Sequence, residues 1–471
     1  MKKITWKDLQ KLNDAELHNI GNRREKNIER VSTDSRTAGN GTLFIAIRGE
    51  RFDAHEFIPD VSSKGVSAII AQKQWVAQHR DMVEASDAVF VAVPDTITAL
   101  GQLAQLYRKK FDIPLIAIGG SNGKTTTKEM VTAILRTKYS VLSTEGNLNN
   151  HIGVPQTLFR LSSEHDAAVV ELGTNHPGEM KYLCGIAEPT HGLITNIGKE
   201  HLEFFTDEQG VADEETELFR YLEKTNGRAF VNMDDQFLQE GEWKFKKVIT
   251  YGTSSKADIR AKKIEVHESG NSSFQCVWRK KEKSLKVNLS VPGVHSVTNA
   301  LAAAAVGLQM NVKENKITQA LNEFTSASKR MEAITYNDIM ILNDTYNSNP
   351  DSVIAALQTL QAIKTKGRKI VVFGDMKELG ESSKREHANI GAVAAGMKYA
   401  RLFTIGPFSK YTSEMFGNNA EHFESKDELA RRLKEFVRSG DIVLVKGSRG
   451  MKMEEIVSRM TEDMYTTETI H

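Results

Sequence analysis

The sequence predicts an α/β protein of three domains, and three observations support this fold class. The chain has 471 residues, which suits about three domains of ordinary size. Its composition, with 40% hydrophobic and 26% charged residues, is that of a folded protein with material for several cores. Over the last two thirds of the chain, short apolar strands alternate with helical segments, which is typical of largely parallel sheets covered by helices.

The same composition excludes several classes of function. The 62 basic and 61 acidic residues leave a net charge of +1, so we expect no nucleic-acid partner. The 2 cysteines can form neither a disulfide framework nor a zinc motif. The start of the chain lacks the apolar segment of a signal peptide, and the most apolar run, residues 300–308, is too short to cross a membrane. We therefore expect a cytoplasmic protein without membrane insertion.

The first domain, predicted over residues 1–110, has mixed character. Its strands are expected at 31–36, 42–47 and 66–71, and its helices at 57–64 and 96–107. The last of these helices carries apolar residues at the spacing of one helical face. The run Lys-Lys-Phe-Asp-Ile-Pro at 109–114 ends this pattern, so we place the first boundary there.

The second domain, predicted over residues 111–328, alternates strands with helices and ends in antiparallel strands. Short apolar strands are expected at 115–118, 167–170, 193–195, 230–231 and 248–250. Helical patterns lie at 126–135 and 296–308, and two or three antiparallel strands at 259–291.

The third domain, predicted over residues 329–471, is a second α/β unit. Its strands are expected at 369–373, 402–405 and 442–445, with a helix at 429–437 between the last two. Strands and helices that alternate in this way are typical of a doubly wound, Rossmann-like sheet.

A glycine-rich loop after the first central strand is the strongest local signal. The loop reads Gly119-Gly120-Ser121-Asn122-Gly123-Lys124-Thr125-Thr126. Its glycines would let backbone N–H groups converge on phosphate oxygens, and the helix start adds a partial positive charge. Lys124 would then reach the terminal phosphates, and Thr125 would coordinate Mg²⁺. We therefore expect a central domain like that of phosphate-loop ATPases.

The loop is a variant of the strict pattern. That pattern requires a glycine five places before Gly123, where Ile118 stands. The alternative interpretation is a glycine-rich turn with a chance lysine. The apolar strand before the loop and the helical pattern after it favour the phosphate loop.

Motifs in all three predicted domains can be compared with known families as a set. They lie at 33–36, 43–46, 49–55, 120–129, 147–155, 195–198, 201–203, 344–350, 374–380 and 446–449. In this order and spacing they resemble the Mur ligases, the ATP-dependent amide-forming enzymes of peptidoglycan synthesis. The last three motifs resemble the branch of that family that adds D-alanyl-D-alanine.

The resemblance implies a reaction and its partners. ATP would phosphorylate the terminal carboxylate of UDP-N-acetylmuramoyl-tripeptide, and the amine of D-alanyl-D-alanine would attack the acyl phosphate. Because two anions must meet, Mg²⁺ and Lys124 would screen their charges. The N-terminal domain would bind the UDP-sugar peptide, the central domain ATP, and the C-terminal domain would close over both. A monomer is expected.

The resemblance also assigns residues to the nucleotide and the metal. The expected ATP-binding residues are Gly120, Ser121, Asn122, Gly123, Lys124, Thr125, Thr126, Asn299, Arg330 and Asp344. Glu171 would join Thr125 as a Mg²⁺ ligand, and His201 would bind a second Mg²⁺. Lys124, Glu171 and His201 would take part in catalysis. Without the family, Asn299 could be a helix cap, Arg330 a linker charge and His201 a structural histidine.

A third group would bind the substrates. Ser35, Arg36, Asp53 and His55 are expected at the UDP end, and Asn149, Asn150, Tyr346, Asn347 and Asn349 near the reacting groups. Further candidates for the dipeptide site are Asp375, Glu378, His387 and Lys446. Arg36 could instead pair with Asp34, and the two neighbouring asparagines at 149 and 150 could be turn residues.

One position departs from the family where chemistry is concerned. The family carries a lysine after His201 that CO₂ converts to a carbamate, and this carboxylate helps hold a second Mg²⁺. Here the aligned segment, 210–219, places Glu215 at that position, and no lysine lies between Lys199 and Lys224. The Glu215 side chain is roughly three bonds shorter than a carbamylated lysine, a gap that one of the waters on Mg²⁺ could bridge.

Three interpretations of this departure stay open. Glu215 replaces the carbamate as a catalytic metal ligand without any need for CO₂. Alternatively, the metal site is weakened and the ligase is slow or altered. In the third case the ligase chemistry is lost, and the protein binds nucleotide or a cell-wall precursor for another purpose. The overall alternative is therefore a non-catalytic or altered-substrate Mur ligase paralogue that binds nucleotide. The retained Lys124, Thr125 and Glu171 favour the first two interpretations.

Overall fold

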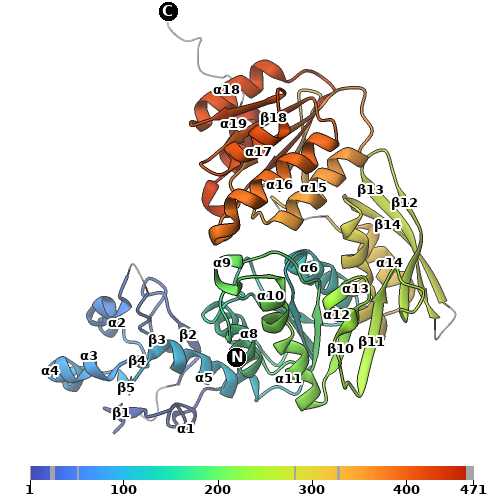
Figure 1. The fold of residues 1–471 in the computed structure, drawn as a ribbon. Coiled ribbons are helices and arrows are strands. Elements are labelled where there is room, and N and C mark those ends of the chain that lie inside the picture. Colours follow the sequence, from blue (N-terminus) through green and yellow to red (C-terminus); the bar gives the residue numbers. More distant parts are fainter. Residues whose placement is uncertain (1, 22–26, 50–51, 280–282, 326–328, 463–471) are drawn as a thin grey trace, which may run out of the picture.

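The structure is a computed structural model that describes residues 2–21, 27–49, 52–279, 283–325 and 329–462. It contains three sheets with helices packed against them, which confirms the predicted α/β fold class (Figure 1). In this view the C-terminal domain stands over the central domain, and the N-terminal domain lies to one side. Glu50 and Arg51 of the N-terminal motif, and residues 326–328 at the predicted second boundary, lie outside the described residues.

The N-terminal sheet has 5 strands in the order β1-β5-β4-β3-β2, and only β1 runs antiparallel to its neighbour. The strands are β1 (Glu16–His18), β2 (Arg30–Ser32), β3 (Thr42–Ile45), β4 (Ala68–Gln72) and β5 (Val89–Val93). The helices are α1 (Trp6–Leu9), η2 (Ala54–Phe57), α2 (Ile58–Ser63), α3 (Lys73–Gln78), α4 (Arg80–Ala85) and α5 (Thr96–Arg108). Strands β1 and β5 were not predicted.

Helix α5 joins the N-terminal domain to the central one. Asp95 caps its first turn by accepting a hydrogen bond from the Thr98 N–H. The helix packs against α7 (Gly153–Leu158) and α8 (Glu179–Ala187) of the central domain. At its end the buried Tyr107 hydroxyl donates a 2.7 Å hydrogen bond to the Leu161 carbonyl. The two domains therefore share one continuous apolar core.

The central sheet has 9 strands in the order β14-β13-β12-β11-β10-β9-β6-β8-β7. The first six along the chain are parallel: β6 (Leu115–Gly119), β7 (Val141–Ser143), β8 (Ala167–Glu171), β9 (His191–Ile194), β10 (Arg228–Asn232) and β11 (Lys247–Gly252). The last three strands, β12 (Ile259–Val266), β13 (Asn271–Trp278) and β14 (Lys283–Pro292), form the predicted antiparallel segment. Strand β6 lies between β8 and β9, where the strand order reverses, and parallel sheets bind ligands at such a point.

Helices cover both faces of this sheet. Besides α7 and α8 they are α6 (Lys124–Arg136), α9 (Leu202–Phe205), α10 (Glu208–Glu215), α11 (Glu217–Thr225), α12 (Gln236–Glu240), α13 (His295–Gln309) and α14 (Glu314–Asn322). Helix α13 is rich in alanine and packs closely on α6. Small residues allow this approach, since a Cβ at Gly307 would lie 2.6 Å from the Ile134 side chain. The C-terminal half of α6 is thereby packed closely against α13.

The C-terminal sheet has 6 strands in the order β15-β16-β20-β17-β18-β19, and all except β15 are parallel. The strands are β15 (Glu332–Tyr336), β16 (Ile339–Asp344), β17 (Lys369–Gly374), β18 (Arg401–Ile405), β19 (Ala420–Phe423) and β20 (Ile442–Lys446). The helices are α15 (Pro350–Ala362), η4 (Gly380–Ser382), α16 (Ser383–Gly396), α17 (Ser409–Phe416), α18 (Lys426–Phe436), η5 (Arg449–Met451) and α19 (Glu454–Thr461).

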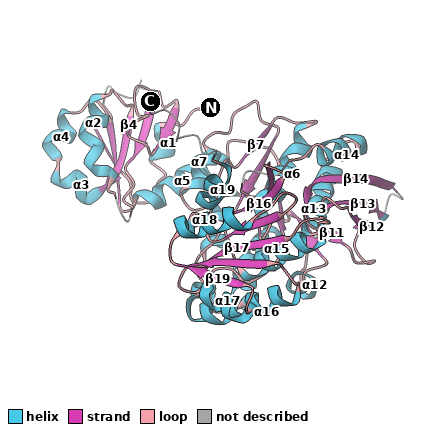
Figure 2. Ribbon diagram, turned by 90° about the horizontal axis from the view of Figure 1, so that it is seen from above, coloured by secondary structure: helices cyan, strands magenta, loops and turns pink. Residues whose placement is uncertain are grey.

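This sheet is covered on both faces, as a doubly wound fold requires. One core joins the sheet to α15 and α16, and the other joins it to α18 and α19 (Figure 2). The hairpin β15–β16, which was not predicted, turns at Asn337 and Asp338 with φ of 47° and 63°. Asparagine and aspartate tolerate this left-handed conformation better than other residues with a side chain. Among the described helices, none is long and apolar enough to cross a membrane.

Candidate active site

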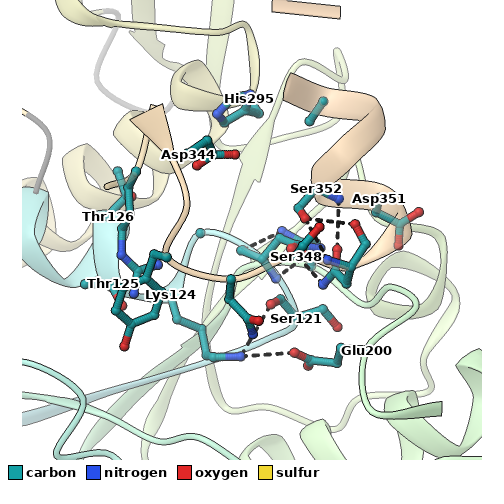
Figure 3. Close-up of a pocket in the computed structure, with 18 of the residues that line it drawn as sticks. Ser121, Lys124, Thr125, Thr126, Glu200, His295, Asp344, Ser348, Asp351 and Ser352 are labelled. Atoms are coloured by element: carbon teal, nitrogen blue, oxygen red, sulfur yellow. Dashed lines mark hydrogen bonds and ion pairs between the residues drawn. The ribbon is translucent and has the colours of Figure 1, made fainter. Parts of the chain in front are cut away.

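A cleft of about 840 Å³ lies between the central and C-terminal domains, and Figure 3 shows part of its lining. The phosphate loop borders it on one side, and the ends of β16 and β20 border it on the other, with Asp344 and Lys446. Most of the predicted nucleotide, metal and peptide residues line this cleft: Ser121, Asn122, Gly123, Lys124, Thr125, Thr126, Asn149, Asn150, Glu171, His201, Asn299, Arg330, Asp344, Tyr346, Asn347 and Asn349.

The phosphate loop is held in place from β9 and the residues after it. Gly120 has φ of 110°, and a Cβ there would lie 2.3 Å from the Thr195 hydroxyl, so only glycine fits. The Ser121 N–H donates to the Asn196 carbonyl at 2.8 Å, and the Asn122 N–H donates to the Asn196 side chain at 3.0 Å. The N–H groups of the first turn of α6 have no acceptor within the helix, which suits them to phosphate oxygens.

Lys124 is the first residue of α6, and its ammonium lies in an acidic environment. It donates to the Gly120 carbonyl and pairs with Glu200 at 3.3 Å (Figure 3). Burial alone would lower the pKa of Lys124, but the nearby carboxylates, Glu200 first and then Glu215 and Glu171, raise the pKa above its ordinary value. Lys124 therefore stays charged, as a phosphate-binding group must.

Glu171 ends β8 and is 3% exposed. Its carboxylate accepts hydrogen bonds from the Thr125 hydroxyl and the Asn149 amide, both at 2.9 Å. The three side chains predicted around the metal and the γ-phosphate are thus in contact. The hydrogen bond to Glu171 directs the Asn149 side chain toward the predicted metal site, so Asn149 is more than a turn residue.

The oxygen donors of Thr125 and Glu171 fit Mg²⁺. Mg²⁺ is bound in such sites by one or two carboxylates together with substrate phosphates and water. Within the described ranges, no three His, Cys, Asp or Glu side chains are grouped closely enough to hold a metal ion on their own. Such a site would bind the metal together with the nucleotide phosphates rather than as an all-protein cage.

His201 lies beside a carboxylate that was not predicted. Its Nε2 is 4.0 Å from Glu200 Oε2, and its Nδ1 is 2.8 Å from Glu378 Oε2. Glu200 is 7% exposed, lines the cleft and pairs with Lys124. In the sequence, Glu200 was marked by its place between the family motifs at 195–198 and 201–203. Its partnership with Lys124 spans 76 positions and could not be read from those motifs.

Glu215 ends α10 and lies beneath the phosphate loop, 1% exposed. Its carboxylate accepts hydrogen bonds from the Gly120 N–H at 2.6 Å and from the Thr174 hydroxyl at 3.2 Å. A Cβ at Gly119 would lie 2.6 Å from Glu215 Oε2, so the carboxylate needs a glycine there. Burial raises the pKa of Glu215 to about 7, against the lowering influence of Lys124. Glu215 is not among the residues that line the cleft, and its role as a metal ligand stays a prediction.

The C-terminal domain supplies a second group of charged side chains. The Arg330 guanidinium lies over the Tyr346 ring, 3.7 Å from its centre. Lys446 is 2% exposed and pairs with Asp344 at 2.6 Å, and Asp344 also accepts a 3.1 Å hydrogen bond from the Met331 N–H. The predicted ribose acceptor is therefore fixed by a buried lysine.

Two residues of α13 also line the cleft. Asn299 lies inside the helix rather than at its cap, and a Cβ at Gly123 would come within 2.6 Å of the Asn299 side chain. His295 was not predicted as a site residue, but it lines the cleft near Asp344 (Figure 3). Burial lowers the pKa of the His295 imidazole.

Other asparagines have structural hydrogen bonds. Asn150 accepts hydrogen bonds from the N–H groups of Ile152 and Gly153, as its turn interpretation predicts. Asn349 caps α15 and donates to the Asn122 side chain at 3.0 Å, so it ties the C-terminal domain to the phosphate loop. The Asn347 carbonyl accepts a 3.0 Å hydrogen bond from the Lys446 ammonium.

The residues predicted for the UDP end lie in the N-terminal domain, outside the cleft lining. His55 is 3% exposed, and its ring bonds to Asp53 at 2.6 Å and to the Gln72 N–H at 3.0 Å. Arg36 is exposed and pairs with Asp34 at 2.7 Å, as the alternative interpretation predicted. Ser35 lies in the same loop, where its carbonyl accepts a hydrogen bond from a lysine.

Two candidates for the dipeptide site have structural hydrogen bonds instead. Asp375 is 3% exposed and accepts from the Phe408 and Ser409 N–H groups at the start of α17. His387 is fully buried; its Nε2 accepts from the Met376 N–H at 2.9 Å, and its Nδ1 lies 2.7 Å from the Ser383 carbonyl. The other two candidates, Glu378 and Lys446, do line the cleft.

Family models match the chain in three successive segments. Residues 27–108 match the model described as Mur ligase family, catalytic domain. Residues 118–307 match the Mur ligase middle domain, and residues 329–449 match the Mur ligase, glutamate ligase domain. Each match contains strands of a different one of the three sheets.

Curated relatives are similar to nearly the whole chain. The UDP-N-acetylmuramoyl-tripeptide–D-alanyl-D-alanine ligase of Bacillus subtilis (strain 168) is 34% identical over 443 residues, which cover 92% of this chain and 93% of that protein. The ligase of the same name from Escherichia coli (strain K12) is 35% identical over 447 residues, with coverage of 93% and 94%.

Solved structures agree with these relatives. A crystal structure of MurF from Acinetobacter baumannii has a TM-score of 0.89 at 32% identity and covers 98% of this chain and 100% of that one. MurF ligase from Thermotoga maritima in complex with ADP has a TM-score of 0.82 at 26% identity, with coverage of 92% and 97%. The similarity therefore extends over all three domains.

Proposed function

This chain belongs to the Mur ligase family, and from that membership we propose that it ligates D-alanyl-D-alanine to UDP-N-acetylmuramoyl-tripeptide with ATP, in peptidoglycan synthesis. One observation in the structure supports this most directly. Lys124, Thr125 and Glu171 of the central domain face Asp344 and Lys446 of the C-terminal domain across one cleft. This arrangement suits a nucleotide held between two domains.

The residues around the phosphate loop would prepare the first step. Mg²⁺, when bound, would neutralise phosphate charge and polarise the γ-phosphoryl group. Thr125 and Glu171 are the residues that would hold it. His201 would hold a second Mg²⁺, with Glu215 a further predicted ligand behind the loop. Lys124 would bind the terminal phosphates, which would compete with Glu200 for its ammonium.

Positioning would supply the remaining acceleration. Asn149 lies against Glu171 and could orient the peptide carboxylate toward the γ-phosphoryl group. The carboxylate would take the γ-phosphoryl group from ATP, with ADP as the leaving group. The amine of D-alanyl-D-alanine would then attack the acyl phosphate and displace phosphate. Asp344 would bind the ribose, and Arg330 would contact the phosphates from the C-terminal side. The UDP-sugar would lie on the N-terminal domain, near Ser35 and Arg36.

The N-terminal domain is connected to the reacting centre through α7. The Gln156 side chain, on that helix, donates a 2.9 Å hydrogen bond to the Thr33 hydroxyl in the loop before Arg36. Asn150, three residues before the start of α7, lines the cleft. A long substrate with a UDP end and a peptide end could therefore extend along this helix. We propose that the protein acts as a cytoplasmic monomer.

The test is a complete ligase assay. The protein is incubated with ATP, Mg²⁺, UDP-N-acetylmuramoyl-tripeptide and D-alanyl-D-alanine, and phosphate release and UDP-N-acetylmuramoyl-pentapeptide are measured. Equal amounts of both products support the proposal. No pentapeptide at high enzyme concentration, in protein that still binds ATP, would support the alternative of a non-catalytic paralogue. The lysine and diaminopimelate forms of the tripeptide are compared in parallel.

A further inference from the structure

The segment 198–203 of the central domain, here called the His201 segment, is held by acidic residues of the C-terminal domain. Asp351 accepts a hydrogen bond from the Lys199 N–H at 2.7 Å, and the Lys199 ammonium pairs with Glu386 at 3.3 Å. The Glu378 carbonyl accepts from the Glu203 N–H at 3.2 Å. The conformation of the segment therefore depends on the position of the C-terminal domain.

The imidazole of His201 has a different partner on each side. Its Nδ1 lies 2.8 Å from Glu378 Oε2, in the C-terminal domain. Its Nε2 lies 4.0 Å from Glu200 Oε2, in the central domain. The His201 side chain is 14% exposed, and His201, Glu200 and Glu378 all line the cleft. Both His201 and Glu378 adopt positive φ, at 49° and 66°, a backbone conformation that L-residues seldom take.

The contact with Glu378 selects the form of the ring. A carboxylate can only accept a hydrogen bond, and a lone pair on Nδ1 would repel it at 2.8 Å. The proton of the neutral imidazole therefore belongs on Nδ1, even though the two groups are not aligned as a regular hydrogen bond. The lone pair is then on Nε2, which borders the same space as the Glu200 carboxylate.

We propose that Glu378 is a positioning residue for His201, and that docking of the C-terminal domain thereby completes a divalent-cation site at His201 Nε2 and Glu200. The proposal deepens the proposed function, since the cation would be the second Mg²⁺, the one assigned to His201. Histidines that bind metals usually donate their other N–H to a carboxylate or carbonyl, and loss of that partner typically weakens metal binding about 10- to 100-fold. Glu378 is such a partner, supplied from another domain.

A simpler explanation is that Glu378 only fastens the two domains together. The Lys199–Glu386 pair offers a matched control, because it joins the same segment to the same domain without touching the imidazole. Lys199→Met removes that domain contact and leaves Glu378 in place. A fastening role predicts equal effects of Lys199→Met and Glu378→Ala, whereas a positioning role predicts an effect on the ring from Glu378→Ala alone.

The first test observes the ring in the metal-free, full-length protein. The histidines are labelled with ¹⁵N, and the His201 signals are identified by their loss in His201→Asn. In alkaline buffer the wild type and Lys199→Met are expected to show the Nδ1–H form, and Glu378→Ala a shift toward the Nε2–H form. An unchanged His201 spectrum in Glu378→Ala would overturn the proposal.

The second test measures Mn²⁺ affinity by electron paramagnetic resonance in the presence of ADP. Glu378→Ala is expected to weaken Mn²⁺ binding about 10-fold, and to have no further effect when His201 is already replaced by alanine. Equal losses in Lys199→Met and Glu378→Ala, or additive losses with His201→Ala, would contradict a positioning role. Neither test uses the tripeptide or the dipeptide, so a failed ligase assay rejects the proposed function without altering these results.

Discussion

The Glu215 carboxylate accepts a hydrogen bond from the Gly120 N–H at 2.6 Å. A side chain at the end of α10 thus holds the backbone of the phosphate loop from beneath. It stands where the family resemblance places a carbamylated lysine, and it brings a negative charge of its own close to Lys124. We infer that this ligase obtains its carboxylate from its own chain rather than from CO₂.

Glu215→Ala tests the contact with the loop. The variant leaves the buried Gly120 N–H without its acceptor, which costs about 1–3 kcal/mol, or roughly 5- to 150-fold in binding. We expect kcat/KM for ATP to fall within this range, as measured by phosphate release.

Glu214→Ala is the matched control for that variant. Glu214 is the preceding residue of α10, is 6% exposed and accepts hydrogen bonds from the Gly178 and Met180 N–H groups, away from the loop. This variant should lose stability but keep the KM for ATP. Similar ATP kinetics in wild type and Glu215→Ala would count against the role of Glu215.

Glu215 also predicts a dependence of stability on pH. Burial raises its pKa from 4.5 to about 7, so between these values the folded protein binds a proton that the unfolded chain releases. Because the folded state binds more protons there, this group adds stability as the pH falls. Glu215→Gln lacks the contribution.

The measurement is the thermal midpoint of wild type and Glu215→Gln at several pH values. The midpoint of the wild type should rise relative to the variant between about pH 7.5 and pH 5. A difference between the two proteins that does not change with pH would show that Glu215 does not take up a proton on folding.

Lys124→Met removes the ammonium that faces the acidic side chains of the cleft. Loss of one group that stabilises transition-state charge typically lowers kcat about 10²- to 10³-fold, and we expect a loss of this size in pentapeptide formation. The control is Lys128→Met, one turn further along α6, because that buried lysine donates to the Thr144 carbonyl at 3.0 Å and does not line the cleft. Comparable kcat losses in the two variants would argue against a specific role of Lys124.

Much of the fold could be predicted because its signals are local. Helices α5 and α13 are long and apolar on their buried faces, and strands such as β6 and β8 are short, buried and mostly apolar runs. Edge strands β1, β7 and β19 were missed, since each has only 3 or 4 residues and so shows little pattern. The buried run Val89–Val93 had such a signal and was overlooked.

The residues of the candidate site likewise fall into those that local sequence predicts and those whose contacts depend on the fold. The phosphate loop is contiguous in the sequence, so its residues could be named in advance. Glu200 and Glu378 were not predicted as partners of Lys124 and His201, because those contacts form only when distant segments and separate domains meet. The position of Glu215 followed from the family resemblance, but its bond to Gly120 depends on how α10 packs under the loop.

A comparison of ligase rates with and without bicarbonate needs a positive control, a variant whose rate is expected to depend on bicarbonate. Glu215→Lys restores the residue type that the family carries at this position. We expect its ligase rate to be low in bicarbonate-depleted buffer and to rise when bicarbonate is added. A rate that stays low at all bicarbonate concentrations would mean that the surroundings of Glu215 no longer accept the lysine.

The most direct test of where the carboxylate comes from is the rate of pentapeptide formation by the wild-type protein, with and without bicarbonate. Buffers are freed of CO₂, and the rate is compared before and after bicarbonate is added. Since Glu215 already supplies a carboxylate beside the loop, we predict product formation at the same rate in both conditions. A rate that depends on bicarbonate would contradict the inference that Glu215 supplies the carboxylate in place of a carbamate.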